Sequence, residues 1–156
     1  MLNKQQLIAL SGMKIADKNP FLTFYRSGFI CVYTGAIAFR MKCAMNIPVD
    51  CQIPLEEVRP LGELSSLRLE KDMLIVNEKL TVAYKEPRYR ETSMRVFNVQ
   101  AREKCSDYDP NLIYLIGKIN SAFTASKFFH IKQHGDQAGV VDLTDDVRIV
   151  IMPVKL

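Results

Sequence analysis

The order of the hydrophobic segments constrains the fold more than any other feature of the sequence. A short helical pattern followed by alternating strand patterns occurs three times along the 156 residues. One helix packed on three or four antiparallel strands cannot cover the edges of its own sheet, so such units tend to sit side by side and share a sheet. We therefore predict an α+β fold built of repeated helix-plus-antiparallel-sheet units.

The first unit is predicted to be a short helix followed by three strands. Residues 3–12 have the apolar spacing of a helix. Residues 21–33 predict a β-hairpin, because two alternating runs flank a polar turn that contains glycine. A further strand is predicted at residues 36–45, after a turn at Thr34-Gly35.

The second unit repeats this order in a shorter form. Residues 53–64 predict a helix that begins at Pro54 and is limited by Pro60. Residues 67–86 predict three short alternating strands. Their turns are expected at Lys71-Asp72 and at Asn77-Glu78.

The third unit contains the strongest helical pattern. A strand is predicted at residues 94–101, and residues 107–120 predict a helix with Asp109 as its N-cap and Pro110 in its first position. The strands that follow are predicted at residues 127–132, 138–143 and 147–156.

Composition excludes several classes of protein. The apolar runs are too short to span a membrane, and no basic, apolar leader opens the chain. The four cysteines are Cys31, Cys43, Cys51 and Cys105, and none of them forms a C-x-x-C pair. We expect reduced thiols in a cytoplasmic protein without contact to a membrane; a scattered disulfide is the alternative.

The sequence offers little support for an enzyme. His130 and His134 are four residues apart, a spacing that converges on a metal only in a helix, whereas strand and turn are predicted here. Two surface histidines are the simpler interpretation. The chain has no nucleophile elbow and no phosphate-binding loop. We therefore expect no catalytic residues, no metal and no cofactor.

The end of the sequence is an apolar run that contains a proline. Residues 147–156, "VRIVIMPVKL", resemble the C-terminus of bacterial sliding clamps, the beta subunits of DNA polymerase III. Residues 108–119, "YDPNLIYLIGKI", resemble the helix before that ending. Residues 79–91, "KLTVAYKEPRYRE", resemble the strand and linker that close the family's middle domain. The chain thus resembles a shortened, clamp-like protein.

The resemblance implies a division of the chain and a peptide-binding groove. Residues 1–92 would form a clamp-like domain of two units, and residues 93–156 a third, half-domain unit. In the family the C-terminal tail lines a hydrophobic groove for short peptides of replication proteins. Carried over to this sequence, the groove residues are Thr34, Gly35, Pro87, Tyr89, Arg90, Val150, Ile151, Met152, Pro153, Val154, Lys155 and Leu156. Ala36-Ile37 replaces a His-Arg pair of the family, and the alternative for the tail is a plain core strand.

The implied function is that of a processivity factor that encircles double-stranded DNA and tethers DNA polymerase or clamp-loader peptides. Residues 1–49 support this with six basic side chains and one acidic one, although a solvated basic face is the alternative. The expected contacts to the DNA backbone are Lys4, Lys14, Lys18, Arg59 and Lys118. Four copies of a three-unit chain would complete a ring, and a dimer would leave it open. The alternative function is a non-ring interaction protein, such as a virus would encode, that binds replication partners or competes with the host clamp.

Overall fold

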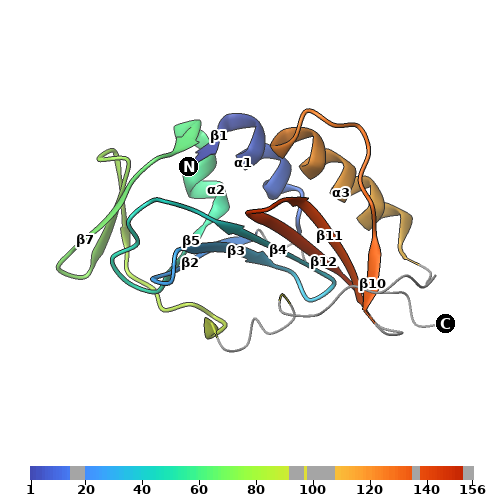
Figure 1. Ribbon diagram of the computed structural model, residues 1–156. Helices are drawn as coiled ribbons and strands as arrows, with labels where there is room; N and C mark the ends of the chain where they lie inside the picture. Colours follow the sequence, from blue (N-terminus) through green and yellow to red (C-terminus); the bar gives the residue numbers. More distant parts are fainter. Residues whose placement is uncertain (15–19, 92–96, 98–107, 135–137, 153–156) are drawn as a thin grey trace.

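The computed structural model describes residues 1–14, 20–91, 97, 108–134 and 138–152 (Figure 1). Most of its strands belong to one long antiparallel sheet. They are β2 (Phe21–Tyr25), β3 (Phe29–Tyr33), β4 (Ile37–Lys42), β5 (Cys51–Pro54), β10 (Lys132–His134), β11 (Ala138–Thr144) and β12 (Val147–Ile151). The order of the seven strands is β10-β11-β12-β4-β3-β2-β5.

The helices cover one face of this sheet. They are α1 (Lys4–Ser11), α2 (Leu55–Val58), the 3-10 helix η1 (Arg59–Leu61) and α3 (Pro110–Phe123). Figure 1 shows α1, α2 and α3 in a layer above the strands, with α1 beside α3. We call this the helix layer, and we call the uncovered side of the sheet its outer face. The predicted α+β class is therefore confirmed.

Two smaller sheets complete the described structure. β1 (Leu2–Asn3) pairs with β6 (Glu63–Leu64), next to the helix layer. β7 (Leu67–Glu70), β8 (Met73–Val76) and β9 (Leu80–Ala83) form a three-stranded sheet at one end of the molecule. The three strands predicted for residues 67–86 are thus confirmed. Their turns contain Lys71, Asn77 and Glu78 at φ values of 54°, 52° and 55°.

Capping side chains fix the starts of the two longer helices. The Asn3 side chain accepts a hydrogen bond from the Gln6 backbone N–H, and the Gln6 side chain accepts one from the Asn3 N–H, each 2.9 Å long. In α3, Asp109 Oδ1 accepts a 2.8 Å bond from the Asn111 N–H, and Pro110 occupies the first helical position. Both helices were predicted, and both are confirmed.

The helix predicted at residues 53–64 is confirmed in part, because residues 55–61 are helical. Its first residues belong to β5, which pairs with β2 so that Ile53 lies opposite Leu22. The helical part consists of the four residues of α2 and the three residues of η1 that follow directly. Gly62, at φ 75°, then turns the chain into β6. Pairing at a sheet edge and the pair of breakers Pro60 and Gly62 thus shorten the predicted helix at both ends.

Two predicted strands differ from the structure. Of residues 127–132, only Lys132 belongs to a strand, because Asn120 of α3 holds the segment before it as a loop. The Asn120 side-chain amide donates to the carbonyl oxygens of Ser126 and Phe128, at 3.0 and 3.3 Å. The strand predicted at residues 94–101 lies outside the described residues apart from Phe97, which is buried.

Alternation along the strands separates the core from the outer face. On β4, the side chains of Ile37, Phe39 and Met41 pack into the main core beneath the helix layer, together with Leu7 and Leu10 of α1. The intervening residues Ala38 and Arg40 therefore point to the outer face. On β12, Ile149 and Ile151 likewise enter the main core.

The first and third units are joined by direct strand pairing. β12 runs antiparallel to β4 over five residue pairs, from Val147 opposite Met41 to Ile151 opposite Ile37. The strands of the predicted 93–156 unit therefore continue the sheet of residues 1–92, and α3 packs against α1 above this joint. The expectation that the units share a sheet is confirmed for the first and third units, whereas β7, β8 and β9 of the second unit form a sheet of their own.

A substitution of Gly139 on β11 tests how tightly the side chains pack around this strand. A Cβ atom at Gly139 would lie 2.8 Å from side-chain atoms of Ile131, Ile151 and Tyr108. We expect Gly139→Ala to lower the free energy of unfolding by about 1–3 kcal/mol, because the close contacts overpack the core. Urea denaturation followed by circular dichroism measures the difference.

The control for this substitution is a glycine with more room. Gly117 lies inside α3, and its added Cβ would meet the Phe129 ring at 3.8 Å, an ordinary contact. Gly117→Ala should raise stability by about 0.5–1 kcal/mol through helix propensity. Equal unfolding midpoints for the two variants would contradict the packing described for β11.

Candidate functional site

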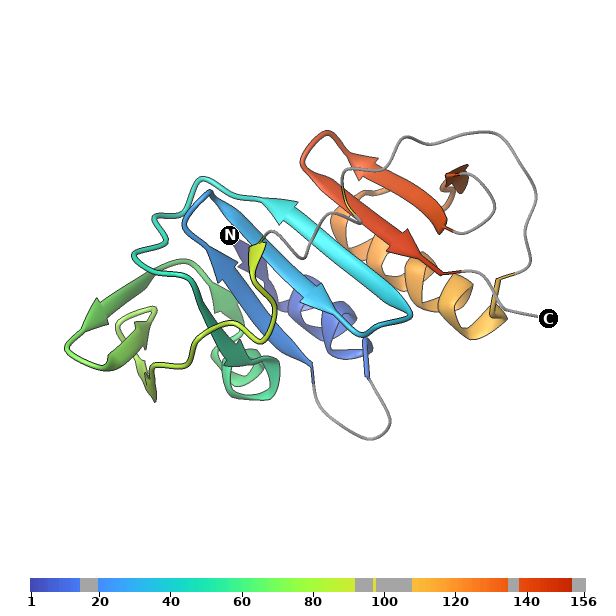
Figure 2. The ribbon, with the colours of Figure 1, turned by 90° about the horizontal axis from the view of Figure 1, so that it is seen from below.

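A second group of apolar side chains gathers on the outer face of the sheet. We call it the outer-face cluster. Its buried members are Tyr25, Cys31, Ala38, Phe97, Ala138 and Val150, and its partly buried members are Phe29, Tyr33, Tyr89 and Met152. Figure 2 looks toward this face, with the helices behind the strands. The cluster contains three of the predicted groove residues, which are far apart in the sequence.

The linker after β9 is held against this face by two tyrosines. The Tyr25 hydroxyl donates a 2.8 Å hydrogen bond to the Tyr89 carbonyl oxygen. The rings of Tyr33 and Tyr89 meet edge to face, with their centres 4.8 Å apart. Residues 85–91 accordingly cross in front of the strands in Figure 2. Burial raises the pKa of Tyr25 above its ordinary value, so this hydroxyl stays a donor at neutral pH.

The end of β12 is tied to the turn between β3 and β4. The Met152 N–H donates to the Ala36 carbonyl oxygen at 2.9 Å. The turn itself is closed by Thr34, whose N–H and hydroxyl both donate to the Ile37 carbonyl oxygen, and Gly35 adopts φ 86°. The turn, the linker and the strand end are therefore neighbours.

The structure separates the predicted groove residues into three groups. Tyr89, Val150 and Met152 belong to the outer-face cluster. Ile151 lies on the opposite side of the sheet, 0% exposed in the main core, as the alternation along β12 requires. Pro153, Val154, Lys155 and Leu156 lie outside the described residues.

Exposure varies among the groove residues that remain. Val150 is 1% exposed, so it supports the site from below and offers no surface to a partner. Gly35 and Arg90 are exposed, whereas Thr34, Pro87, Tyr89 and Met152 are half-buried. Val150 and Ile151 therefore match the alternative of a core strand, and Met152 is the described part of the tail that reaches the surface.

Hollows flank the cluster on two sides. Pro87 and Arg90 line one of about 700 Å³, with Tyr25 at its wall. Thr34 lines another of about 520 Å³, together with Lys14 and Tyr114. The second hollow lies toward the helix layer, so the predicted groove residues face two different spaces.

The predicted DNA contacts gather in the helix layer. Lys4 begins α1, Lys14 follows it, Arg59 begins η1 and Lys118 lies on α3, and all four side chains are exposed. The Lys118 ammonium group lies 4.7 Å from the ring centre of Tyr114. Lys18 lies outside the described residues. The layer also carries the exposed acidic residues Glu56 and Glu57 on α2.

An arginine pair on the outer face was missed by the sequence analysis. Arg148 on β12 stands opposite Arg40 on β4. Arg148 donates to both carboxylate oxygens of Asp142, at 2.6 and 2.9 Å, and to the Phe97 carbonyl oxygen at 3.0 Å. The strand patterns of residues 36–45 and 147–156 contained the signal, because each places an arginine on its polar side.

The described residues offer no metal centre. None of their histidine, cysteine, aspartate and glutamate side chains form a group of three that could hold an ion. His130 is exposed, and the His134 side chain lies outside the described part. Cys31, Cys43 and Cys51 are free thiols, and burial raises the pKa of Cys31 to about 12. No described helix has the length and apolar character needed to cross a membrane.

The helix layer, the shared sheet and the repeated units together define the fold of the bacterial DNA clamps. No protein-family model matches the sequence, and no curated protein sequence matches it significantly. Solved structures do. The beta subunit of DNA polymerase III from Thermotoga maritima matches 99% of this chain with 63% of its own, at a TM-score of 0.63 and 12% identity.

Two further structures show the same likeness. The Borrelia burgdorferi beta subunit, solved in complex with a natural product, matches 99% of the chain with 62% of its own, at a TM-score of 0.60 and 10% identity. The Pseudomonas aeruginosa subunit matches 97% with 64% of its own, at 0.57 and 12%. The clamp-like fold is thus confirmed, and the chain spans less than two thirds of each of these proteins.

The bond from Tyr25 to the linker gives a testable prediction. Tyr25→Phe removes the donor to the Tyr89 carbonyl, so we expect a loss of about 1 kcal/mol in the free energy of unfolding and faster amide exchange in residues 85–90. The control is Tyr33→Phe, which keeps the ring contact to Tyr89 and should change stability by less than about 0.5 kcal/mol. Unchanged exchange in Tyr25→Phe would contradict the role given to this bond.

Proposed function

We propose that this chain is a clamp-fold processivity protein that encircles duplex DNA and tethers replication proteins by short peptides. The observation that carries the proposal is the meeting of three distant segments on one face. The Met152 to Ala36 hydrogen bond and the Tyr33 to Tyr89 ring contact bring together the segments that the resemblance to sliding clamps singles out. The clamp-like fold supports the same conclusion.

The DNA-facing surface in this proposal is the helix layer. Lys4, Lys14, Arg59 and Lys118 are exposed on or next to the helices of this layer, whereas the outer-face cluster lies across the sheet. Side chains of this kind meet phosphates without reading bases, so bound protein can slide along the duplex. Glu56 and Glu57 weaken the field near α2, which leaves α1 and α3 as the main contacts.

The peptide site is the exposed rim of the outer-face cluster. Gly35 and the half-buried Thr34, Met152 and Pro87 surround it, with Val150 beneath. An apolar anchor side chain would pack on Met152 and Tyr89, and the backbone around the β3–β4 turn would supply polar contacts. Such docking raises the local concentration of a polymerase at the primer. Encircling and tethering need no chemical step, so we infer that the protein is not an enzyme. We also infer that it is cytoplasmic.

Binding to duplex DNA tests the assignment of the helix layer. The double variant Lys14→Gln and Lys118→Gln should weaken binding, and the slope of log K against log salt should fall by about 2, one for each lost phosphate contact. Fluorescence anisotropy with a labelled duplex across a salt series measures this slope.

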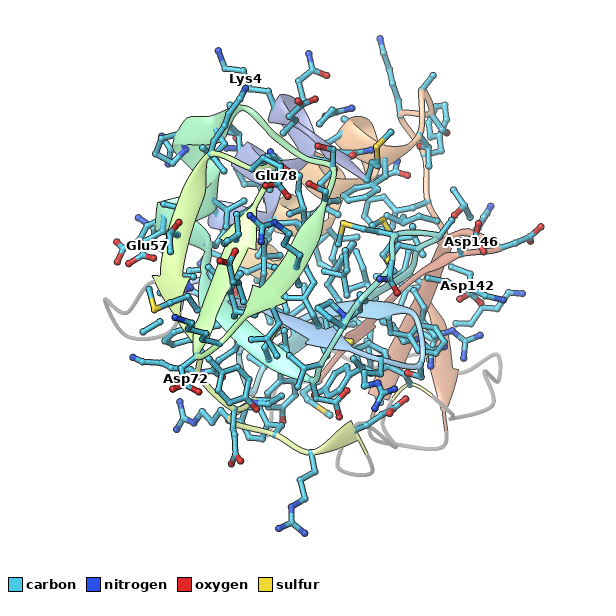
Figure 3. The ribbon with its side chains drawn as sticks, turned by 90° about the vertical axis from the view of Figure 1, so that its left-hand side faces the viewer. Lys4, Glu57, Asp72, Glu78, Asp142 and Asp146 are labelled. Carbon is cyan, nitrogen blue, oxygen red and sulfur yellow. The ribbon has the colours of Figure 1, made fainter. Side chains whose placement is uncertain are left out.

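The control variant is Lys71→Gln. Lys71 is exposed in the turn between β7 and β8, next to Asp72, which Figure 3 shows on the opposite side of the view from Lys4. Its slope should equal that of the unmodified protein. Two results would contradict the proposed DNA contact. One is that the unmodified protein binds no duplex even at low salt. The other is that the salt slope falls as much in Lys71→Gln as in the double variant.

Ring formation is the second part of the proposal. A chain with three units needs partners to surround a duplex, and we infer a homotetramer, with an incomplete dimeric ring as the lesser assembly. Analytical ultracentrifugation should find four copies of the 17.8 kDa chain, and electron micrographs should show rings. A monomer at high concentration would contradict encirclement.

The acidic α2 favours a second candidate function. In a ring whose helix layer faces the duplex, the negative charges of Glu56 and Glu57 would oppose contact with the phosphates. A clamp-fold protein without a ring would avoid this repulsion. Such a protein would bind replication partners at the outer face and compete with a host clamp. A monomer that captures replication peptides but no duplex would support this candidate.

A further inference from the structure

Arg40 occupies an unusual place on the outer face. Its guanidinium carbon lies 4.8 Å from the ring centre of Phe29 and 5.1 Å from that of Phe97. Contact with the two rings stabilises the cation, but the rings do not take the place of the oxygen acceptors that its five N–H donors can bind. Phe97 is 0% exposed and fixes one side of this arrangement.

Arg40 has no acceptor for those donors among the described residues. The neighbouring Arg148 is held by both oxygens of Asp142 and by a carbonyl oxygen. Arg40 is half-buried, and among the described residues it makes ring contacts but no hydrogen bond. Burial is the main cause that lowers the pKa of Arg40, and the charge of Arg148 also lowers it, whereas Cys31 and Asp142 act in the opposite direction. A half-buried cation without an acceptor is unfavourable, and a bound anion would relieve it.

A hollow of about 560 Å³ opens beside this guanidinium. Arg40 and Lys42 supply positive charge to it, and Phe29 and Phe97 supply apolar surface. Three carboxylates line the same hollow, those of Asp142, Asp145 and Asp146, and Asp142 is already paired with Arg148. Figure 3 shows Asp142 and Asp146 on the β11–β12 hairpin. These carboxylates disfavour a polyanion such as nucleic acid more strongly than a ligand that carries a single negative charge.

We propose that Arg40, in contact with the rings of Phe29 and Phe97, is the receptor for one side-chain carboxylate of an acidic peptide that docks on the outer face. The site is continuous with the proposed peptide site, because both rings belong to the outer-face cluster that contains Met152 and Tyr89. The inference rests on the proposed function and adds to it a preference for an aspartate or glutamate next to an apolar residue.

The guanidinium edge suits this ligand. A carboxylate in the plane of the fork can accept two parallel N–H bonds, which a lysine at the same place cannot offer. The neighbouring apolar side chain of the peptide would pack on Phe29, which is half-buried. Replacing the carboxylate by an amide should weaken binding about tenfold, the loss expected for charge-assisted hydrogen bonds.

Solution NMR of the whole chain tests the proposal with a defined probe. The probe is N-acetyl-Phe-Glu-amide, and the matched probe is N-acetyl-Phe-Gln-amide. The Arg40 Nε–H signal and the backbone amides of residues 38–42 should shift with the first probe and shift about tenfold more weakly with the second. Arg40→Lys should bind the first probe more weakly, and Arg40→Gln should abolish the difference between the probes.

A control variant separates this effect from a general loss of charge. Arg68→Gln removes an exposed arginine that pairs with Glu70 and Glu78 on the three-stranded sheet, and its binding should be unchanged. The backbone spectrum of each variant shows whether it is folded. The proposal is overturned when the Phe-Glu probe leaves Arg40 unshifted, or when inorganic phosphate or a short duplex shifts Arg40 at lower concentration.

The same spectra distinguish this inference from the proposed function. Shifts at Ala36 and Met152 without shifts at Arg40, on addition of longer acidic peptides, would overturn the carboxylate site and support the peptide site. Shifts at Arg40 alone would support the carboxylate site and contradict docking on the rest of the outer face.

Discussion

The pairing of β12 with β4 is the interaction on which the rest of the structure depends. It joins residues that are about a hundred positions apart, and its five residue pairs continue one sheet through the first and third units. The register places Ile149 and Phe39 together in the core beneath the helix layer. The same register places Val150 beside Ala38 on the outer face. A slip of one residue would exchange the two faces, so both surfaces are fixed by this single ladder.

Both proposed binding surfaces follow from that ladder. Because α3 is brought against α1, the exposed Lys14 and Lys118 come to one side of the sheet. Because β12 ends beside the β3–β4 turn, Met152 reaches Ala36 on the other side. The ladder also sets the arginine pair of the outer face. Arg148 is paired with Asp142, whereas Arg40 has no hydrogen-bond acceptor in the part of the chain that the structure describes, so the outer face combines apolar surface with a cation that can accept a partner.

The sequence predicted the features that depend on local chemistry. The helix starts at Asn3 and Asp109 and the turn at Lys71 follow from capping and turn preferences within a few residues. Features set by distant partners were predicted less well. Ile53 and Pro54, predicted as the start of a helix, pair with β2 instead. Of the predicted groove, Tyr89, Val150 and Met152 do meet, but Ile151 faces the core. The contact of Arg40 with two rings needs Phe29 and Phe97 at once, which no spacing in the sequence reveals.

Hydrogen–deuterium exchange across a urea series tests the central claim most directly. If β12 and β4 form one ladder, the amides of residues 37–42 and 147–151 should lose protection at the same urea concentration, together with α1 and α3. Loss of protection in residues 138–151 at clearly lower urea, while residues 21–42 stay protected, would show that the third unit is not part of this sheet and would contradict the account.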